Sequence, residues 1–162
     1  MRFTVAENSI VEKGAEIGND TVIWYFSHVR KNAKVGAECS VGDHCFIDEG
    51  VIVGNNVRIG NGVSLYKGNI VKDNVRIGPN ATFTNVRNPR TDIKGKIKYT
   101  IIEENVYIGA GAKIVCGITI GKDSRVAEGA VVYYNVPQGS FVSAPRAQMK
   151  YSLKVNRVPT YE

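Results

Sequence analysis

Residues that commonly hold metals or serve as nucleophiles are scarce in this sequence. It contains two histidines and three cysteines among 162 residues. The cysteines are odd in number and form no CxxC pair, and no histidine pair stands at metal-ligand spacing, so we expect neither a disulfide framework nor a zinc site. A carbonic anhydrase is excluded as well, because its zinc needs about three histidine ligands.

Long apolar runs and a leader pattern are also missing. No stretch approaches the roughly 18 consecutive apolar residues that indicate a membrane-spanning helix. Residues 1–14 lack the basic stretch followed by an apolar run that marks a secretory signal. We therefore expect a cytoplasmic protein with no membrane partner. A chain of this length suits a single domain with a sizeable core.

The positive charge is not gathered into one block. The formal net charge is +6 at pH 7, but no helix-turn-helix, zinc-finger or RNA-binding signature accompanies it. We therefore expect no nucleic-acid partner. The excess charge suits phosphate groups on a small anionic ligand.

A strict period of six dominates the sequence. Aliphatic or aromatic residues stand at every sixth position, in one register from Val5 to Phe83 and in a second register from Ile102 to Val132. The full series is Val5, Val11, Ile17, Ile23, Val29, Val35, Val41, Ile47, Val53, Ile59, Leu65, Val71, Ile77 and Phe83, then Ile102, Ile108, Ile114, Ile120, Val126 and Val132. An α-helix would spread these positions around its circumference, whereas a short strand and a turn in every six residues would align them.

Three hexads make one triangular coil, and stacked coils bury the aliphatic residues in a continuous core. The period therefore predicts a parallel β-helix over residues 1–145, followed by a tail at 146–162 with a short helix at 147–157. Glycine follows the aliphatic residue on two of the three faces, which indicates tight corners there. The general rule for parallel crossovers predicts right-handed coils.

The third face differs chemically from the other two. Its outward positions are His28, Phe46, Ser64 and Thr82. Beside these positions run polar and aromatic residues, namely Arg30, Asp48, Tyr66 and Thr84, with Glu49, Lys67 and Asn85 one residue further on. The repeat breaks once, directly after this face, in an inserted loop at 85–100 that is rich in lysine and arginine. Such a loop suits a phosphate or carboxylate, and a flat face becomes a cleft when another subunit covers it, so we expect a homotrimer with sites at subunit boundaries.

The third face offers few groups for proton transfer. His28 can act as a general base or pack in a subunit contact, and the sequence leaves both roles open. Asp48 or Glu49 can orient a base or bind a sugar hydroxyl or amine. Cys39 and Cys45 occupy core positions without a neighbouring base, so we do not expect a nucleophilic cysteine.

Four segments resemble the nucleotide-sugar N-acetyltransferases of the hexapeptide-repeat family, which modify 3-amino sugars for bacterial surface polysaccharides. The segments are IWYFSHV at 23–29, VSLYKGN at 63–69, IGPNATFTNVRNPR at 77–90 and IVCGITIG at 114–121. The resemblance implies an all-β, left-handed parallel β-helix and transfer of acetyl from acetyl-CoA to the 3-amino group of a UDP- or dTDP-linked sugar. It also implies direct attack on the thioester, with no acyl-enzyme and no metal.

The resemblance further suggests the site residues. Asn85 lies at the acceptor position, and Tyr66, Asn88 and Arg90 are candidates for holding the sugar and its diphosphate; Glu49, Lys67 and Thr84 complete the substrate set. For coenzyme A the resemblance implies the late coils and a proline segment after them, and we expect Gly109, Ala110, Gly111, Lys113, Arg125, Pro145 and Arg146. The family's usual Pro-Ala-basic order reads Pro145-Arg146 here, which leaves the phosphate partner of coenzyme A open.

Two other interpretations remain open. An O-acetyltransferase would need His28 as a true base, because a hydroxyl is far less nucleophilic than an amine at neutral pH. A non-catalytic scaffold would use the trimer only for assembly and would bind no acyl-CoA. The sequence does not choose between UDP and dTDP or identify the sugar.

Overall fold

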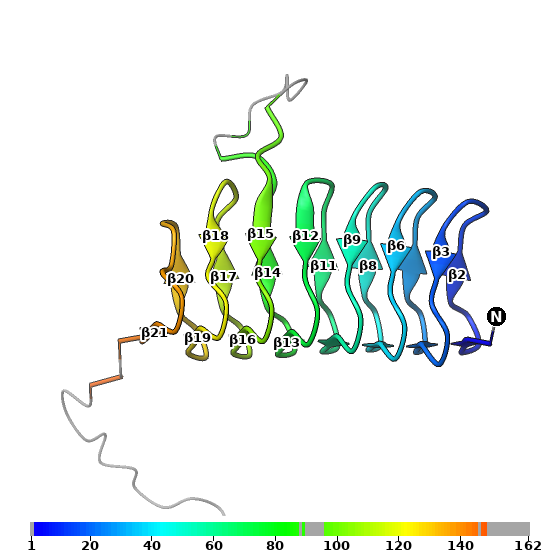
Figure 1. The fold of residues 1–162 in the computed structure, drawn as a ribbon, viewed down its shortest axis with the longest axis horizontal. Coiled ribbons are helices and arrows are strands. Elements are labelled where there is room, and N and C mark those ends of the chain that lie inside the picture. Colours follow the sequence, from blue (N-terminus) through cyan, green and yellow to red (C-terminus); the bar gives the residue numbers. More distant parts are fainter. Residues whose placement is uncertain (1, 88, 90–95, 146, 149–162) are drawn as a thin grey trace, which may run out of the picture.

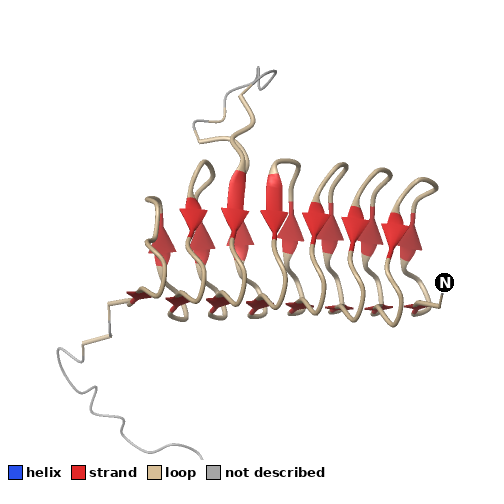
Figure 2. Ribbon diagram, in the orientation of Figure 1, coloured by secondary structure: helices blue, strands red, loops and turns tan. Residues whose placement is uncertain are grey.

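The structure is a computed structural model that describes residues 2–87, 89, 96–145 and 147–148. Short parallel strands form a three-sided prism in this part of the chain, with no helix among the described residues (Figures 1 and 2). Each strand pairs with the equivalent strand of the next coil, usually eighteen residues on, as Thr4 with Val22 and Val29 with Ile47. This is the all-β architecture that the period of six predicts.

The three sides of the prism are three sheets. Sheet A contains β1 (Thr4–Val5), β4 (Val22–Ile23), β7 (Ser40–Val41), β10 (Arg58–Ile59), β13 (Arg76–Ile77), β16 (Tyr107–Ile108), β19 (Arg125–Val126) and β21 (Phe141–Val142). Sheet B contains β2 (Ile10–Val11), β5 (His28–Val29), β8 (Phe46–Ile47), β11 (Ser64–Leu65), β14 (Thr82–Phe83), β17 (Lys113–Ile114) and β20 (Val131–Val132). Sheet C contains β3 (Glu16–Ile17), β6 (Lys34–Val35), β9 (Ile52–Val53), β12 (Asn69–Val71), β15 (Thr100–Ile102) and β18 (Thr119–Ile120). We number the coils 1 to 7 from the N-terminus; coils 1 to 6 run through sheets A, B and C in that order, and coil 7 has its strands β19 and β20 in sheets A and B.

The fold matches the left-handed β-helix of hexapeptide repeats, with about seven turns. The right-handed rule rests on how a crossover helix packs back onto its sheet. Here the connection between paired strands runs through two further strands and contains no helix, so that physical reason does not apply.

The core is the continuous aliphatic column that the sequence predicts. The largest fully buried side chains include Phe83, Ile23, Ile47 and Leu65. Val5 is 37% exposed because it lies in the first coil, which has a neighbouring coil on one side only. Small polar residues in the core satisfy the backbone at corners: the Ser27 hydroxyl donates to the carbonyl of Gly42 at 2.7 Å and accepts the N–H of Cys45 at 2.9 Å.

Glycine is required after the core residues for a reason other than a positive φ. A Cβ on Gly18 would lie 2.4 Å from the backbone nitrogen of Ala37 in the next coil. Gly18, Gly36 and Gly54 are absent from the positive-φ residues, so close approach of neighbouring coils excludes a side chain there.

The inserted loop leaves the prism between β14 and β15, at the corner where sheet B meets sheet C (Figure 1). The N–H of Lys98 donates to the carbonyl of Asn85 at 2.8 Å and closes the neck of the loop. The strand of sheet C already begins at Thr100, so the loop ends one residue before the predicted boundary.

At the other end of the chain, β21 adds one strand to sheet A beyond the last predicted hexad. Apart from residues 147–148, the tail and its expected helix lie outside the described residues. The described residues include no helix that is long and apolar enough to cross a membrane.

Candidate functional site

The outward side of sheet B carries the polar and aromatic residues that the sequence assigns to one face. His28, Phe46, Ser64 and Thr82 pair in register across successive coils, and Lys113 continues the row after the insertion. The neck of the inserted loop stands at one edge of this row, because Asn85 is the second residue after β14. We call this row of side chains the ladder, and the fold places it beside the neck of the inserted loop.

His28 is held by a carboxylate that the sequence analysis did not single out. Its Nε2 lies 2.8 Å from Oε1 of Glu12, one coil earlier. The N–H of Lys31 and the His28 side chain both hydrogen-bond to Glu12 and lower the pKa of its carboxyl below the ordinary value. An ionised carboxylate only accepts hydrogen bonds, so Nε2 carries the proton and Nδ1 of the neutral ring is an acceptor. Glu12 stands eighteen residues before Arg30 in the same row, and this spacing is the signal that could have identified it.

Asp48 is engaged by structural contacts. The Arg30 guanidinium lies 3.0 Å from its Oδ1, and the backbone N–H groups of Glu49 and Lys67 donate to its two carboxylate oxygens at 2.7 and 3.2 Å. Asp48 therefore fixes the corner between sheets B and C. Glu49 is half-buried beside it, with Nδ2 of Asn32 at 3.5 Å from its Oε1, and is the freer of the two carboxylates.

A row of rings crosses sheet B next to a small hollow. The centroid of His28 lies 5.8 Å from that of Phe46, which lies 6.0 Å from that of Tyr66. The hollow beyond Tyr66 has a volume of about 100 Å³. It is lined by Gly62, Ser64, Tyr66, Ala81, Thr82 and Phe83. Tyr66 is thus placed to contact a ligand on this face, while Lys67 is exposed at the adjoining corner.

The base of the inserted loop is tied to the prism. The Arg87 guanidinium donates to the carbonyl of Tyr133 at 2.9 Å, two coils nearer the C-terminus. Asn85 is half-buried at the neck. Thr84, predicted to bind substrate, has a structural contact, because its hydroxyl accepts the N–H of Cys116 at 3.0 Å. Asn88 and Arg90 lie outside the described residues.

The residues predicted for coenzyme A lie around one corner of the late coils. Gly109, Ala110 and Gly111 form the turn between β16 and β17, and Lys113 follows on sheet B. Arg125 projects from sheet A, where its residue pairs with Tyr107. Pro145 is exposed after β21, and Arg146 lies outside the described residues. The turn thus connects sheet A, which carries Arg125, to sheet B, which carries Lys113. Pro145 lies beyond the last coil.

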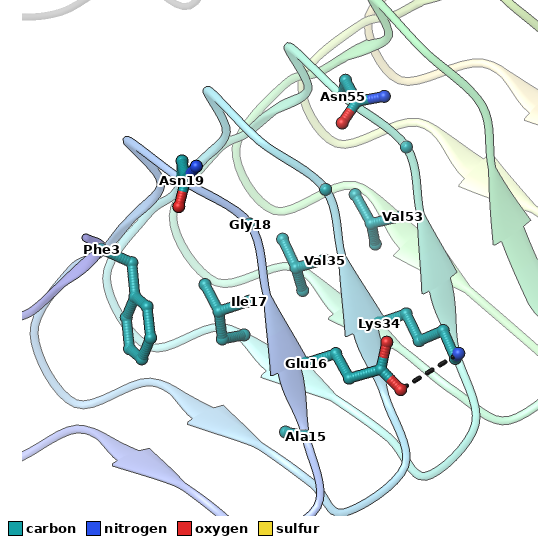
Figure 3. Close-up of a pocket in the computed structure, with 12 residues that line it drawn as sticks. Phe3, Ala15, Glu16, Ile17, Gly18, Asn19, Lys34, Val35, Val53 and Asn55 are labelled. Carbon is teal, nitrogen blue, oxygen red and sulfur yellow. Dashed lines mark ion pairs between the residues drawn. The ribbon is translucent and has the colours of Figure 1, made fainter. Parts of the chain in front are cut away.

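The larger hollows lie away from the ladder. One of about 430 Å³ opens at the corner between sheets A and B, in coils 2 to 4. Another, of about 660 Å³, lies on the early coils beside Phe3 and the glycine corners Gly18, Gly36 and Gly54 (Figure 3). Its lining includes one pair of charged side chains, Glu16 and Lys34, which neutralise each other at 3.1 Å. We favour the ladder as the candidate site, because the exposed Tyr66 ring, the Glu49 carboxylate and the His28 imidazole lie there beside the neck of the inserted loop.

The repeat family described as bacterial transferase hexapeptide (six repeats) matches residues 14–49 and 99–133. A 2,3,4,5-tetrahydropyridine-2,6-dicarboxylate N-acetyltransferase from Staphylococcus aureus is 45% identical over 49 residues, which are 30% of this chain and 20% of that protein. The chain therefore matches about one fifth of the length of this relative.

Two solved structures share the fold over most of the chain. The polySia-specific acetyltransferase NeuO has a TM-score of 0.58 at 21% identity, over 93% of this chain and 85% of its own. A mutant of AntD, an N-acyltransferase from Bacillus cereus in complex with dTDP and coenzyme A, has a TM-score of 0.55 at 20% identity, over 93% of this chain and 84% of its own.

Proposed function

We propose that this protein is a cytoplasmic N-acetyltransferase that transfers acetyl from acetyl-CoA to the 3-amino group of a UDP- or dTDP-linked amino sugar. The observation that carries the proposal is the sheet B ladder, with His28, Phe46, Ser64 and Thr82 in register beside the neck of a basic loop. The hexapeptide-transferase repeats support the acyltransferase class. AntD, which has the same fold, was crystallised with dTDP and coenzyme A, and this supports a nucleotide-bearing acceptor.

The transfer needs no covalent enzyme intermediate. The neutral amine attacks the thioester carbonyl carbon, the C–S bond breaks, and the departing sulfur takes up the proton that the nitrogen loses. Asn85 at the loop neck is the residue we assign to position the acceptor, with Tyr66, Glu49 and Lys67 around the sugar. The buried cysteines are unsuited to attack, because burial raises the pKa values of the Cys39 and Cys45 thiols.

A homotrimer completes the site in this proposal. The hollow on sheet B measures about 100 Å³, whereas pockets for drug-sized ligands occupy roughly 300–1,000 Å³. A neighbouring subunit laid over the ladder would enclose the acceptor and the thioester. This geometry supports sites at subunit boundaries.

An O-acetyltransferase is the second candidate, and one contact favours it. The Glu12 carboxylate orients His28 and leaves Nδ1 as an acceptor, which is the arrangement that a general base for a hydroxyl requires. An amine acceptor would leave this base dispensable. The two chemistries therefore make opposite demands on the same side chain.

Free thiol release tests the proposed function directly. The purified protein is mixed with acetyl-CoA and with UDP- or dTDP-linked 3-amino sugars, and coenzyme A thiol is followed over time. We expect release only when an amino nucleotide sugar is present. Activity on maltose or serine with none on amino sugars would reject the proposal, and the absence of any thermal shift with acyl-CoA would support a non-catalytic scaffold.

A further inference from the structure

Aromatic side chains gather at the corner between sheets A and B in coils 2 and 3, apart from the ladder. Trp24, Tyr25 and Phe26 follow β4 in sequence, and His44 lies beside Phe26 in the next coil. The ring centroids are 6.4 Å apart for Trp24 and Tyr25, and 5.1 Å apart for Phe26 and His44, whose planes meet at 22°. Trp24, Tyr25 and Phe26 are 43, 45 and 54% exposed. We call these four residues the aromatic corner.

The backbone at Phe26 is unfavourable for the side chain it carries. Phe26 has φ = 58° and His44 has φ = 55°. The equivalent positions of the other coils are Asn8, Gly62, Asn80, Gly111 and Gly129, all with positive φ. Asparagine and glycine tolerate this conformation, whereas a bulky residue there is an outlier. Coil 2 therefore keeps a phenylalanine at a strained position where it contributes nothing to the core, and such strain points to a function.

A hollow of about 430 Å³ adjoins the rings of Trp24 and Tyr25, and the Phe26 ring lies next to Tyr25, with 6.5 Å between their centroids. The hollow is lined by Trp24, Tyr25, Ser40, Gly42, Asp43, Ile59 and Asn61. The polar groups in it are already ordered: Asp43 accepts the N–H of Tyr25 at 3.1 Å, Asn61 accepts the N–H of Asp43 at 3.0 Å, and the indole N–H of Trp24 donates to Ser40 at 3.0 Å. The hollow thus combines aromatic faces with a fixed carboxylate and a fixed amide.

We propose that the aromatic corner and this hollow bind the heterocyclic base of a nucleotide. Rings stack on aromatic faces whatever the base, and amide and carboxylate oxygens suit the N–H groups on a base edge. The Asp43 carboxylate disfavours a phosphate in the hollow. This inference rests on the proposed function.

Two nucleotides in the proposed reaction carry such a base. One is the nucleotide sugar, with uracil or thymine, and the other is coenzyme A, with adenine. The predicted coenzyme A turn, Gly109 to Gly111, lies in coil 6, about 14 Å along the axis from coil 3 at the usual strand spacing of about 4.8 Å. The shared chemistry is base stacking, and the experiment separates the two sources.

Trp24 is the single tryptophan of the chain, so its fluorescence reports on the aromatic corner alone. The protein is titrated with UDP, with dTDP and with adenosine 3′,5′-bisphosphate. We expect saturable quenching by at least one of them. Quenching by UDP or dTDP assigns the corner to the acceptor, and quenching by the bisphosphate assigns it to coenzyme A. The absence of saturable quenching with all three overturns the inference.

The Phe26→Asn variant provides the sharper test. Asparagine stands at the equivalent positions 8 and 80, so we expect a melting temperature equal to or above that of the wild type. We expect the Kd of the quenching nucleotide to rise at least about fivefold through loss of stacking. Phe3→Asn is the matched control, because Phe3 is a 40% exposed ring at another corner, and it should leave this Kd unchanged.

The outcomes distinguish this inference from the proposed function. A Phe26→Asn enzyme that releases thiol with unchanged KM for both substrates overturns the inference and leaves the acetyltransferase intact. Saturable quenching that the variant weakens, without thiol release from any amino sugar, supports the base site and rejects the acetyltransferase. If the variant instead dissociates an oligomer while the nucleotide Kd stays the same, the aromatic corner is a subunit contact and the inference is wrong.

Discussion

The imidazole of His28 donates from Nε2 to the carboxylate of Glu12 at 2.8 Å. The two residues come from neighbouring strands of sheet B, β5 and the segment that follows β2. This contact fixes the ring on the outward face and determines which nitrogen can accept a proton. It leads to separate predictions for activity and for stability.

Replacing His28 by Ala distinguishes between the two acetyl acceptors. For a neutral amine we expect a loss of less than about tenfold in kcat, because the attack needs no base. General acid–base catalysis contributes roughly 10²–10⁴-fold, so a loss in that range with intact coenzyme A binding would favour a hydroxyl acceptor or a base-dependent mechanism. Initial rates of thiol release measure the effect, and Ile10→Ala, an exposed change on the same sheet, is the control.

Replacing Glu12 by Gln should make stability less dependent on acid pH. The pKa of Glu12 is lowered in the folded state by the N–H of Lys31 and by His28, so the unfolded chain binds a proton more readily. The resulting stabilisation is present above the unfolded pKa and is lost as the pH falls through the lower folded pKa. Urea unfolding at pH 7 and at pH 3 should show a wild-type advantage only at pH 7; an equal difference at both values would contradict the prediction.

Replacing Gly68 by Ala should displace the inserted loop. Gly68 has φ = +98°, and an added Cβ would lie 2.8 Å from Cγ2 of Ile97 and 3.2 Å from the carbonyl oxygen of Lys98. Gly50→Ala is the control at the same corner one coil earlier, with φ = +71° and no atom within 4 Å of the added Cβ.

Comparing the two variants separates the effect of displacing the loop from the effect of placing alanine at a positive φ. Both variants carry the left-handed penalty of about 1–2 kcal/mol. We expect only Gly68→Ala to raise the KM for the acceptor, by about tenfold or more if the loop positions it. Equal KM values for the two variants would show that the seating of the loop does not affect acceptor binding.

The cysteines should resist thiol reagents in the native protein. Cys39, Cys45 and Cys116 are free and buried, and burial raises the pKa values of the Cys39 and Cys45 thiols, which keeps the reactive thiolate scarce. We expect slow reaction with Ellman's reagent at pH 8 and fast reaction of all three thiols in guanidinium. Rapid native labelling that abolishes acetyl transfer would contradict direct attack on the thioester.

The period of six was sufficient to predict the stacking register. His28 and Phe46 are eighteen residues apart and pair as the spacing requires, because a uniform coil turns a sequence interval into a spatial neighbour. The pattern did not reveal that Thr84 and Asp48 serve the backbone. Hydrogen bonds of this kind depend on side-chain direction and on which backbone groups the corners leave without partners, and residue type does not encode either.

The side chains at the aromatic corner and in the inserted loop were harder to interpret from the sequence. Phe26 looks like an ordinary member of the aromatic segment 24–26 until the corner φ values show that asparagine or glycine stands at its position in five other coils. Likewise, the contact between Arg87 and the carbonyl of Tyr133 joins residues 46 apart. The inserted loop has no repeat, so no spacing rule predicts where its side chains reach.

The sequence by itself determined the three-sided prism, its buried column of aliphatic residues and the chemically distinct face, because the same six-residue pattern recurs along the chain. Only the tertiary structure decided which charged and aromatic groups meet across coils: Glu12 with His28, Arg87 with Tyr133, and Phe26 with His44. Burial of aliphatic side chains tolerates many exact geometries, whereas a hydrogen bond or a ring stack forms only at particular distances and angles.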